Sequence, residues 1–504
     1  MKRSVATALA IGLFIGVCGA QEGWNIVNKT MTGTTPLASQ AFVDVLPFYT
    51  AGGDFCAAIN AAINSVTPPG GVGAIPVTID ARGVPLNAGI SGGPPYLKCV
   101  SNPFRFMGTK AYTGRLLLGP GLIITNTQWN MPNSYFWIEG VAMSNTNAGT
   151  SPVGTVIQAS MSPGITGTNF SCGNGDTGDV NSITLPGITM AGCPVVFISG
   201  NGIAAGQQYA SFGTGIRNLT IDCNVVLHCI GVGSYDVQEG GGVDTVGFIN
   251  QDTACVAFDS SHLAAPAISN PFLRNVNCSF TQPAMGMAPT NWIGIYIYAT
   301  DGPAEISNTT VSVPNIMDSS NPQFAYCLYL DGARGTNINF FHCEHALVGE
   351  FISGNTNLAQ GVSIRGLTAS VTGTGVMLSN AADTIVQDIE MNSYSNVMHP
   401  YNGPLVDGTI AVGGPSNTNL AFYVTSTSKI ASGTAVPTII TTDATTASQL
   451  YQLKLSPVTQ ATLPLSAPLG AIMYCSDCAL NTHPCTGGGP GDLAVGNGSM
   501  WICR

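Results

Sequence analysis

The chain has 504 residues, of which 45% are hydrophobic and only 8% are charged, with a net charge of −11 and 62 glycines. Lys and Arg are too scarce to form a basic run, which excludes a nucleic-acid-binding protein and disfavours docking on an anionic lipid surface. Intrinsic disorder is also excluded, because disordered chains combine low hydrophobicity with high net charge.

The first predicted element is a signal peptide over residues 1–20, in which Lys2 and Arg3 precede an apolar stretch and a small-residue exit. A lipoprotein site at Cys18 is disfavoured by Val17, where such sites usually have a small residue. No later run reaches the roughly 18 consecutive apolar residues of a membrane helix. We therefore expect an exported protein without membrane insertion.

The remaining chain divides by composition into four predicted parts. An N-terminal segment (21–44) precedes one large domain (45–400), a Thr/Ser-rich β region (401–465) and a Cys-rich β module (466–504). Fourteen cysteines follow the predicted signal peptide. An even number in an exported chain predicts disulfides, although their connectivity does not follow from the sequence. Cys172 and Cys193 are candidates for one disulfide across the loop-rich residues 146–190.

Residues 54–66 are the one clear predicted helix. Asp54 can cap its N-terminus, and Ile59, Ile63 and Val66 fall on one face. An amphipathic helix of this kind suits the open hydrophobic end of a repeat stack, and an ordinary packing helix is the alternative. The strand-like segments that follow it are clearest at 116–118, 121–124, 136–138 and 155–157.

Seven later segments share one pattern of apolar residues. Two variable residues separate the first apolar position from the second, and every second residue after that is usually apolar. They are 216–223, 243–250, 273–280, 306–313, 338–345, 364–371 and 386–393. The alternation predicts a strand, and the two variable residues predict a bend before it. Asn218, Asn275 and Asn308 occupy the third position, and Asn tolerates the left-handed conformation that such a corner needs.

Most of these segments follow a second strand-like run that ends in a turn, as at 293–299, 326–330 and 376–378. Each repeat thus consists of strand, turn, strand, bend and strand, without a helix. Helical repeats need helical segments, and a propeller blade needs about 40 or more residues in four antiparallel strands. The pattern therefore predicts an all-β fold, a parallel β-helix.

The early coils carry a family resemblance. The Asp-capped helix, the strand at 75–79 and the segments 118–119, 138–140 and 155–157 resemble the first coils of the rhamnogalacturonase/epimerase-type, pectate-lyase-like superfamily. The resemblance covers roughly residues 45–395. It implies a right-handed parallel β-helix and a polysaccharide ligand. That superfamily includes lyases, hydrolases, epimerases, tail spikes and members without known catalysis, so the fold alone does not fix the activity.

The chain departs from the active members of that superfamily. The Asn-Thr-Asp and Asp-Asp motifs of its galacturonan hydrolases are absent, and the carboxylates that calcium-dependent pectate lyases align along one face are only scattered here. No catalytic residue is therefore carried over, and calcium remains an open cofactor. The Cys-rich terminal module resembles the ends of some tail-fibre and bacterial surface proteins, which implies attachment or assembly.

Positions five and seven of each repeat are predicted to point outward, so that coils about 4.8 Å apart align them in columns. Glu344 and Glu390 are the predicted acid–base pair, roughly 10 Å apart, near the upper limit that glycosidases use. Ordinary solvated carboxylates are the alternative. The same columns supply a third catalytic candidate, His342, and the substrate-binding candidates Thr368, Ser370 and Asn392.

Other polar groups are weighed as binding residues. Asp331 and Arg334 follow a turn and are candidates for a charged pair that binds substrate, with local turn bonding as the alternative for Asp331. Arg365 shares position two of its repeat with Arg217 and Arg274, and a guanidinium suits the carboxylate of a uronic acid.

Two clusters resemble metal sites. Residues 342–345 are disfavoured as ligands because alternate side chains of a strand face opposite ways, and His345 is expected inside with a hydrogen-bond partner. The four terminal cysteines favour disulfides over zinc in an exported chain. No metal site is predicted.

The sequence thus predicts a secreted protein of the extracellular space, cell surface or periplasm that meets an extended, pectin-like polysaccharide. The first interpretation is a carbohydrate-active protein that binds this polysaccharide and cleaves it as a lyase or glycoside hydrolase. The alternative is a non-catalytic adhesive or tail-spike-like glycan binder, which is consistent with the scarcity of charge. The sequence leaves a homo-oligomer open.

Overall fold

The structure is a computed structural model that describes residues 41–504 except for a set of internal gaps. The predicted signal peptide, most of segment 21–44, and Asn392 lie outside the described residues. The gaps are 67–75, 90–93, 105–112, 133–134, 145–152, 162, 173–180, 188–190, 199–210, 263–267, 281–290, 299, 314–323, 355–358, 371–373, 392–405, 408–420, 424–438, 441–456, 464–466 and 468–470.

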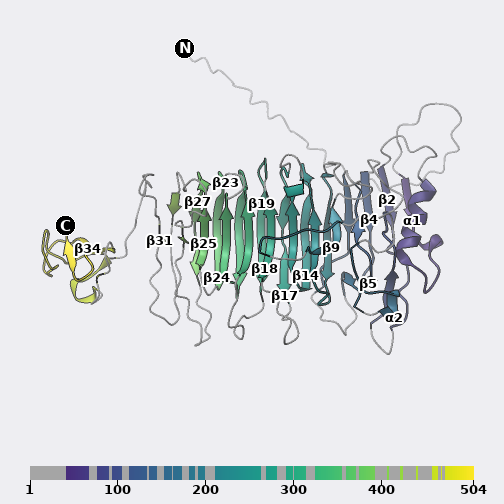
Figure 1. The fold of residues 1–504 in the computed structure, drawn as a ribbon, viewed down its shortest axis with the longest axis horizontal. Helices are drawn as coiled ribbons and strands as arrows, with labels where there is room; N and C mark the ends of the chain where they lie inside the picture. The colour runs from purple at the N-terminus through teal and green to yellow at the C-terminus, as the bar shows by residue number, and fades with distance from the viewer. Residues whose placement is uncertain are drawn as a thin grey trace, which may run out of the picture. The chain divides into compact units, whose positions relative to one another are not determined.

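The predicted right-handed parallel β-helix is confirmed, because each strand pairs in parallel with the equivalent strand of the next coil (Figure 1). We call the first of its sheets the front sheet. Its ten strands follow one another in chain order. They are β6 (Trp129–Asn130), β9 (Cys193–Ile198), β12 (Cys229–Ser234), β15 (Ala254–Asp259), β18 (Asn291–Tyr298), β20 (Phe324–Asp331), β22 (Val348–Ser353), β25 (Thr374–Ser379), β29 (Val406–Asp407) and β31 (Ile439–Ile440).

The second sheet, which we call the bent sheet, has two arms that meet at a corner. Most of its strands belong to the first arm or run through both arms, namely β1 (Ala41–Asp44), β2 (Pro76–Asp80), β4 (Thr113–Leu117), β7 (Phe136–Glu139), β11 (Gly215–Asp222), β14 (Gly242–Gln251), β16 (Phe272–Arg274), β19 (Glu305–Ser312), β21 (Asn337–Glu344), β24 (Ser363–Ser370), β27 (Ile385–Gln387) and β30 (Ala421–Tyr423). Strands of the second arm alone are β3 (Tyr96–Cys99), β5 (Gly121–Thr125), β8 (Thr155–Ala159), β17 (Asn277–Phe280) and β28 (Glu390–Met391).

A narrow third face, the side ladder, lies between the front sheet and the bent sheet in the described coils that contain β9 to β25. It contains the pairs β10 (Ser211–Phe212) with β13 (Val237–Gln238) and β23 (Ala359–Gln360) with β26 (Ala381–Ala382). Single parallel bridges, such as Ile268 with Thr300 and Arg334 with Gln360, continue the same face. One circuit of the chain is therefore front strand, side ladder, first arm, bend and second arm.

The predicted bend is confirmed at every repeat. The third residue of each repeat has a φ between +49° and +72°, and these residues are Asn218, Thr245, Asn275, Asn308, Phe340, Gly366 and Asp388. A residue in the left-handed conformation changes the direction of the strand at the corner. After it, the apolar side chains of the alternating pattern again face the interior. Asn, Asp and Gly adopt this conformation readily, whereas Phe340 and Thr245 do so at a steric cost.

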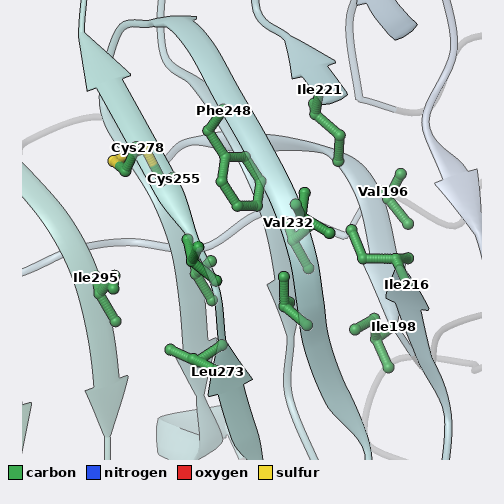
Figure 2. Close-up of a cluster of buried hydrophobic side chains, with 14 of the residues drawn as sticks. Val196, Ile198, Ile216, Ile221, Val232, Phe248, Cys255, Leu273, Cys278 and Ile295 are labelled. Atoms are coloured by element: carbon green, nitrogen blue, oxygen red, sulfur yellow. A yellow bond between two sulfur atoms is a disulfide. The ribbon is translucent and has the colours of Figure 1, made fainter. Parts of the chain in front are cut away.

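The interior is a continuous apolar column. Leu219, Val246 and Val276, the residues on which the predicted register depends, are all buried. Figure 2 shows side chains of the front sheet, such as Val196 and Val232, in one cluster with side chains of the bent sheet. Because each coil buries its inward residues against the next coil, the hydrophobic effect holds the stack together.

The predicted helix forms α1 (Phe55–Val66) at the N-terminal end of the stack (Figure 1). Its buried residues, among them Ile59 and Ile63, join the core of the β-helix. The predicted cap is confirmed, because Asp54 Oδ1 accepts a hydrogen bond from Cys56 N at 3.1 Å. The same carboxylate also accepts from Val100 N at 3.0 Å and so ties the helix to the coil after β3. The remaining helices are short, namely α2 (Pro163–Thr166), η1 (Leu46–Phe48), η3 (Ser260–His262) and η4 (Gln460–Thr462).

All fourteen cysteines after Cys18 form disulfides, as the sequence led us to expect for several of them. The predicted disulfide Cys172–Cys193 is confirmed. The others are Cys56–Cys99, Cys223–Cys229, Cys255–Cys278, Cys327–Cys343, Cys475–Cys478 and Cys485–Cys503. Seven disulfides are typical of a protein that folds in an oxidising compartment.

Parallel stacking does not end near residue 400, where the sequence repeat fades. Val406 pairs with Val376, Ala421 with Ile385, and Ile439 with Val406, so β29, β30 and β31 of the Thr/Ser-rich region extend both sheets. The Cys-rich module has its own sheet of β32 (Pro457–Val458), β33 (Ile472–Cys475), β34 (Asp492–Gly496) and β35 (Trp501–Cys503), in which β33, β34 and β35 are antiparallel. Within the described part of the chain, no helix has the length and hydropathy to span a bilayer.

Candidate functional site

The predicted outward columns exist on the second arm of the bent sheet. His342 pairs with Thr368, which pairs with Glu390, so these three residues occupy one column. Glu344 occupies the neighbouring column, in register with Ser370. The structure therefore brings together four of the predicted site residues whose side chains it describes.

The register places the predicted carboxylate pair farther apart than a separation of two coils alone. Glu390 lies in line with His342 and not with Glu344, so the two glutamates differ by two coils and by two positions along the strand. Strand spacing and rise then place their backbones about 12 Å apart. Two carboxylates that act on one glycosidic bond lie about 5–9.5 Å apart, so this separation does not favour a joint catalytic role.

Glu344 is instead engaged by its own strand. His342 Nε2 lies 3.0 Å from Glu344 Oε1, and both side chains are partly exposed. The hydrogen bond from His342 holds the pKa of Glu344 below its usual value. Glu344 therefore stays ionised at neutral pH and is a poor proton donor. His345 is half-buried, and its Nδ1 lies 3.2 Å from the Val313 carbonyl, which supplies the predicted partner.

The predicted binding residues lie on separate faces of the coil. Asp331 ends β20 on the front sheet, Arg334 belongs to the side ladder, and Arg365 is exposed on the first arm of the bent sheet. Arg217 and Arg274 are hydrogen-bonded to Glu139 and Glu305, so carboxylates of the protein already occupy these guanidinium groups. These residues do not form one site with His342 and Thr368.

A different cluster on the front sheet combines carboxylates and aromatic rings. The last residues of successive strands align in the order Asp259, Tyr298, Asp331, Ser353 and Ser379. Asp259 is 2% exposed and Asp331 is 6% exposed, while Tyr298 is half-buried. Two buried aspartates thus lie one coil on either side of a tyrosine.

The next outward column of the front sheet carries the rings of Tyr296, Tyr329 and Phe351, one per coil. The ring centroids of Tyr296 and Tyr329 are 5.5 Å apart, and those of Tyr329 and Phe351 are 4.8 Å apart. Burial raises the pKa of Tyr296 and of Tyr329, and the negative charge of Asp331 raises both further. Both phenols therefore remain neutral hydrogen-bond donors at any physiological pH.

We call the cluster of Asp259, Tyr296, Tyr298, Tyr329 and Asp331 the tyrosine–aspartate site. Its elements are β15, β18 and β20, and it lies where the front sheet meets the side ladder. Buried titratable groups that perturb one another are typical of functional sites, although structural networks also produce them. The arrangement offers carboxylates for proton transfer and rings for contact with a ligand.

A further buried acid, Asp236, follows β12 at the same end of the front sheet. Its Oδ1 accepts a hydrogen bond from Gln238 Nε2 at 2.8 Å. Burial raises its pKa to about 6, and the charge of Asp301 raises it as well, against the opposing effect of the Gln238 hydrogen bond. Asp236 is therefore an acid that exchanges its proton close to neutral pH, as general acids do.

The sequence does contain a signal for this site. The run 293–299 places Tyr296 and Tyr298 on one face, and the run 326–330 with its following turn does the same for Tyr329 and Asp331. The sequence pattern predicts outward positions only on the bent-sheet strands, where alternation of polar and apolar residues is clear. The front strands are buried on both faces, so they appear as uninterrupted apolar runs without a visible outward side.

Metal-ligating side chains also gather in the described part of the chain. Each group close enough to share an ion contains at least two disulfide-bonded cysteines, as in Cys478, Cys485 and Cys503. Sulfurs in a disulfide are not thiolate ligands, so these groups do not fit a metal ion. Calcium therefore stays a prediction, because no group of acidic side chains suited to it is found among the described residues.

Comparisons with known proteins find likeness only among solved structures. No family model matches the chain, and a search of curated proteins finds no match. The chain is similar to DFA-IIIase from Arthrobacter chlorophenolicus A6 in complex with GF2, at 11% identity and a TM-score of 0.44 over 77% of this chain and 89% of that one.

Two further structures are similar at the same level. The tailspike protein of Escherichia coli bacteriophage HK620, in complex with a pentasaccharide, is 13% identical with a TM-score of 0.41, over 76% of this chain and 57% of that one. Endo-xylogalacturonan hydrolase from Aspergillus tubingensis is 11% identical with a TM-score of 0.35, over 77% of this chain and 86% of that one. The fold assignment itself depends on the strand pairing described above.

Proposed function

We propose that this protein is an exported, carbohydrate-active β-helix protein that binds an extended polysaccharide along the front sheet and hydrolyses it at the tyrosine–aspartate site. The observation that carries the proposal is the column in which Asp259 and Asp331 flank Tyr298. Two coils separate the aspartate backbones by about 10 Å, and side chains that lean together reach the 6.5–9.5 Å range of inverting glycosidases.

In this proposal one aspartate protonates the glycosidic oxygen while the other activates a water molecule on the opposite face of the sugar. Tyr296, Tyr329 and Phe351 supply aromatic surface for the sugar ring, and the neutral phenols donate hydrogen bonds. Hydrolysis is favoured over elimination because the described front-sheet strands contain no Lys or Arg to neutralise a uronate carboxylate.

The test is incubation of the mature protein with pectins and other glycans, with and without calcium. We expect release of reducing ends. Ultraviolet absorbance from an unsaturated product would indicate elimination instead. D259N and D331N are each expected to reduce the rate by about 10²–10⁴-fold, since each removes a proton-transfer group. Thermal unfolding of each variant checks that the fold is intact.

E390Q and E344Q are the matched controls, because both residues belong to the column pair on the bent sheet. They should retain full activity. If they lose activity while D259N and D331N keep it, the site lies on the bent sheet and the front-sheet proposal is wrong.

The second candidate is a non-catalytic glycan binder, as the scarcity of charge suggests. The burial of Tyr296, Tyr329 and Phe351 favours a glycan site elsewhere on the molecule, because rings with at most 7% exposure offer little open surface to a sugar. Retardation of the protein in gels that contain a polysaccharide, without any product, would support this candidate.

A further inference from the structure

Among the described residues, one inward position of the front sheet has a carboxyl group where its neighbours in the column have aliphatic side chains. Glu350 in β22 points inward, in register with Leu328 on one neighbouring coil and Val376 on the other. The earlier members of the same column are Val196, Val232, Val256 and Ile295. Glu350 is 0% exposed, so its carboxyl group replaces an aliphatic side chain in the middle of the core.

Neither carboxyl oxygen of Glu350 has a hydrogen-bond partner in the described structure. The inward residues of the opposing bent-sheet strands are Phe341, Cys343, Leu367 and Ala369, and Cys343 is bonded to Cys327. An ionised carboxylate in such surroundings is far more costly than a neutral one. Burial accordingly raises the pKa of Glu350 to about 8.

No titratable side chain on the packed strands faces Glu350. On β20, Tyr326 and Tyr329 belong to the outer aromatic cluster, and Asp331 shares the outer column of Tyr298. The partly exposed His342 and Glu344 lie on the outer face of β21, and on β24 Arg365 is exposed. The protonation state of Glu350 is therefore set by its burial, without an internal counter-charge.

We propose that Glu350 makes the coils around β22 a pH-sensitive point of the stack, which stays closed while the carboxyl group is protonated and opens as it ionises. Each coil of a solenoid is held only by its neighbours, so opening at β22 does not require the unfolding of distant coils. The strands that separate are β20, β22 and β25, which are hydrogen-bonded neighbours in the front sheet.

The direction of the effect follows from the two protonation equilibria. In an open coil the carboxyl group has its ordinary pKa of 4.5, and in the closed coil its pKa is about 8. Below pH 4.5 both states are protonated and the carboxyl group does not favour opening. Between pH 4.5 and about 8, each pH unit raises the ratio of open to closed coils about tenfold, and above that range the ratio is constant.

Hydrogen exchange of the full-length protein tests the proposal. Peptides that cover β22 are compared at pH 5.5 and pH 7.5, after correction for the intrinsic exchange rate. The wild type is expected to lose about 100-fold in protection over this interval, and E350Q is expected to lose none. Peptides from β5, whose residues Gly121–Thr125 include no titratable side chain, serve as an internal reference whose protection should not change.

E390Q is the matched control, since it removes a carboxylate on a neighbouring part of the stack without changing the interior. It should retain the wild-type loss of protection. If E350Q fails to fold, E350M fills the same space with an apolar side chain and should show the same pH independence. Constant protection of β22 in the wild type, or an unchanged loss in E350Q or E350M, would overturn the proposal.

Discussion

At the scale of single residues, the corner of the bent sheet requires a left-handed backbone conformation, which few side chains adopt without strain. Seven residues adopt the left-handed conformation in the same column, and three of them are the asparagines on which the predicted bend depended. Phe340 was not foreseen, because a bulky residue rarely adopts a positive φ. Its ring is 66% exposed and lies beside Gly366, where an added Cβ would come within 3.1 Å.

Replacing Phe340 by asparagine should therefore stabilise the protein. F340N relieves a left-handed strain of about 1–2 kcal/mol and loses little buried area, so we expect the free energy of unfolding to rise by about 1 kcal/mol. Chemical denaturation measures the change. N308F, which places a ring at the same position of the preceding coil, should have the opposite effect. A decrease in stability for F340N would mean that contacts of the ring outweigh its strain.

At the scale of elements, the bent-sheet strands of the seven repeats could be predicted, whereas β1 and β3 were not. Of the front sheet, the runs at 293–299, 326–330 and 376–378 could be located but not oriented. The second arm of the bent sheet faces solvent, so polar residues such as His342 and Thr368 identify its outer side. The front strands are buried on both faces, and tyrosine counts as apolar in any pattern. For this reason the sequence placed the candidate site on the bent sheet, where carboxylates are conspicuous.

Two disulfides join the front sheet to the bent sheet through the interior, at Cys255–Cys278 and Cys327–Cys343. Each disulfide lies within a single coil and links the front-sheet strand of that coil to its bent-sheet strand. The number of cysteines predicted that such bonds exist. Their partners depend on which side chains meet inside a coil, and that requires the register of both sheets.

Removing the disulfide of the β20–β21 coil should destabilise the protein markedly. The double variant C327A/C343A opens a loop with a sequence separation of 16, for which chain entropy indicates a loss of about 3 kcal/mol. C475A/C478A, with a separation of 3, should lose only about 1.5 kcal/mol in the terminal module. Denaturant titration of both variants tests this order, and an equal loss would exclude the loop-entropy explanation.

At the scale of the whole molecule, stability is distributed along the stack of coils. Each coil contacts only its neighbours, and α1 buries its apolar face on the first coils. The N-terminal coils therefore have a covering element that adds to their stability.

We expect unfolding to begin at the C-terminal coils. In denaturant below the main transition, hydrogen exchange should show peptides of β25 losing protection before those of β12 and β15. Loss of protection at a single denaturant concentration in all three strands would show that the stack unfolds as one cooperative unit.

The column of Asp259, Tyr298 and Asp331 has a consequence for variation of the chain. Their separation in space is set by the number of coils between them, although the two aspartates are 72 positions apart in sequence. Lengthening any loop between them leaves the gap untouched. Gaining or losing a full turn changes it by one step of about 4.8 Å. The scaffold therefore allows the distance between the two acidic groups to change only in multiples of the coil spacing.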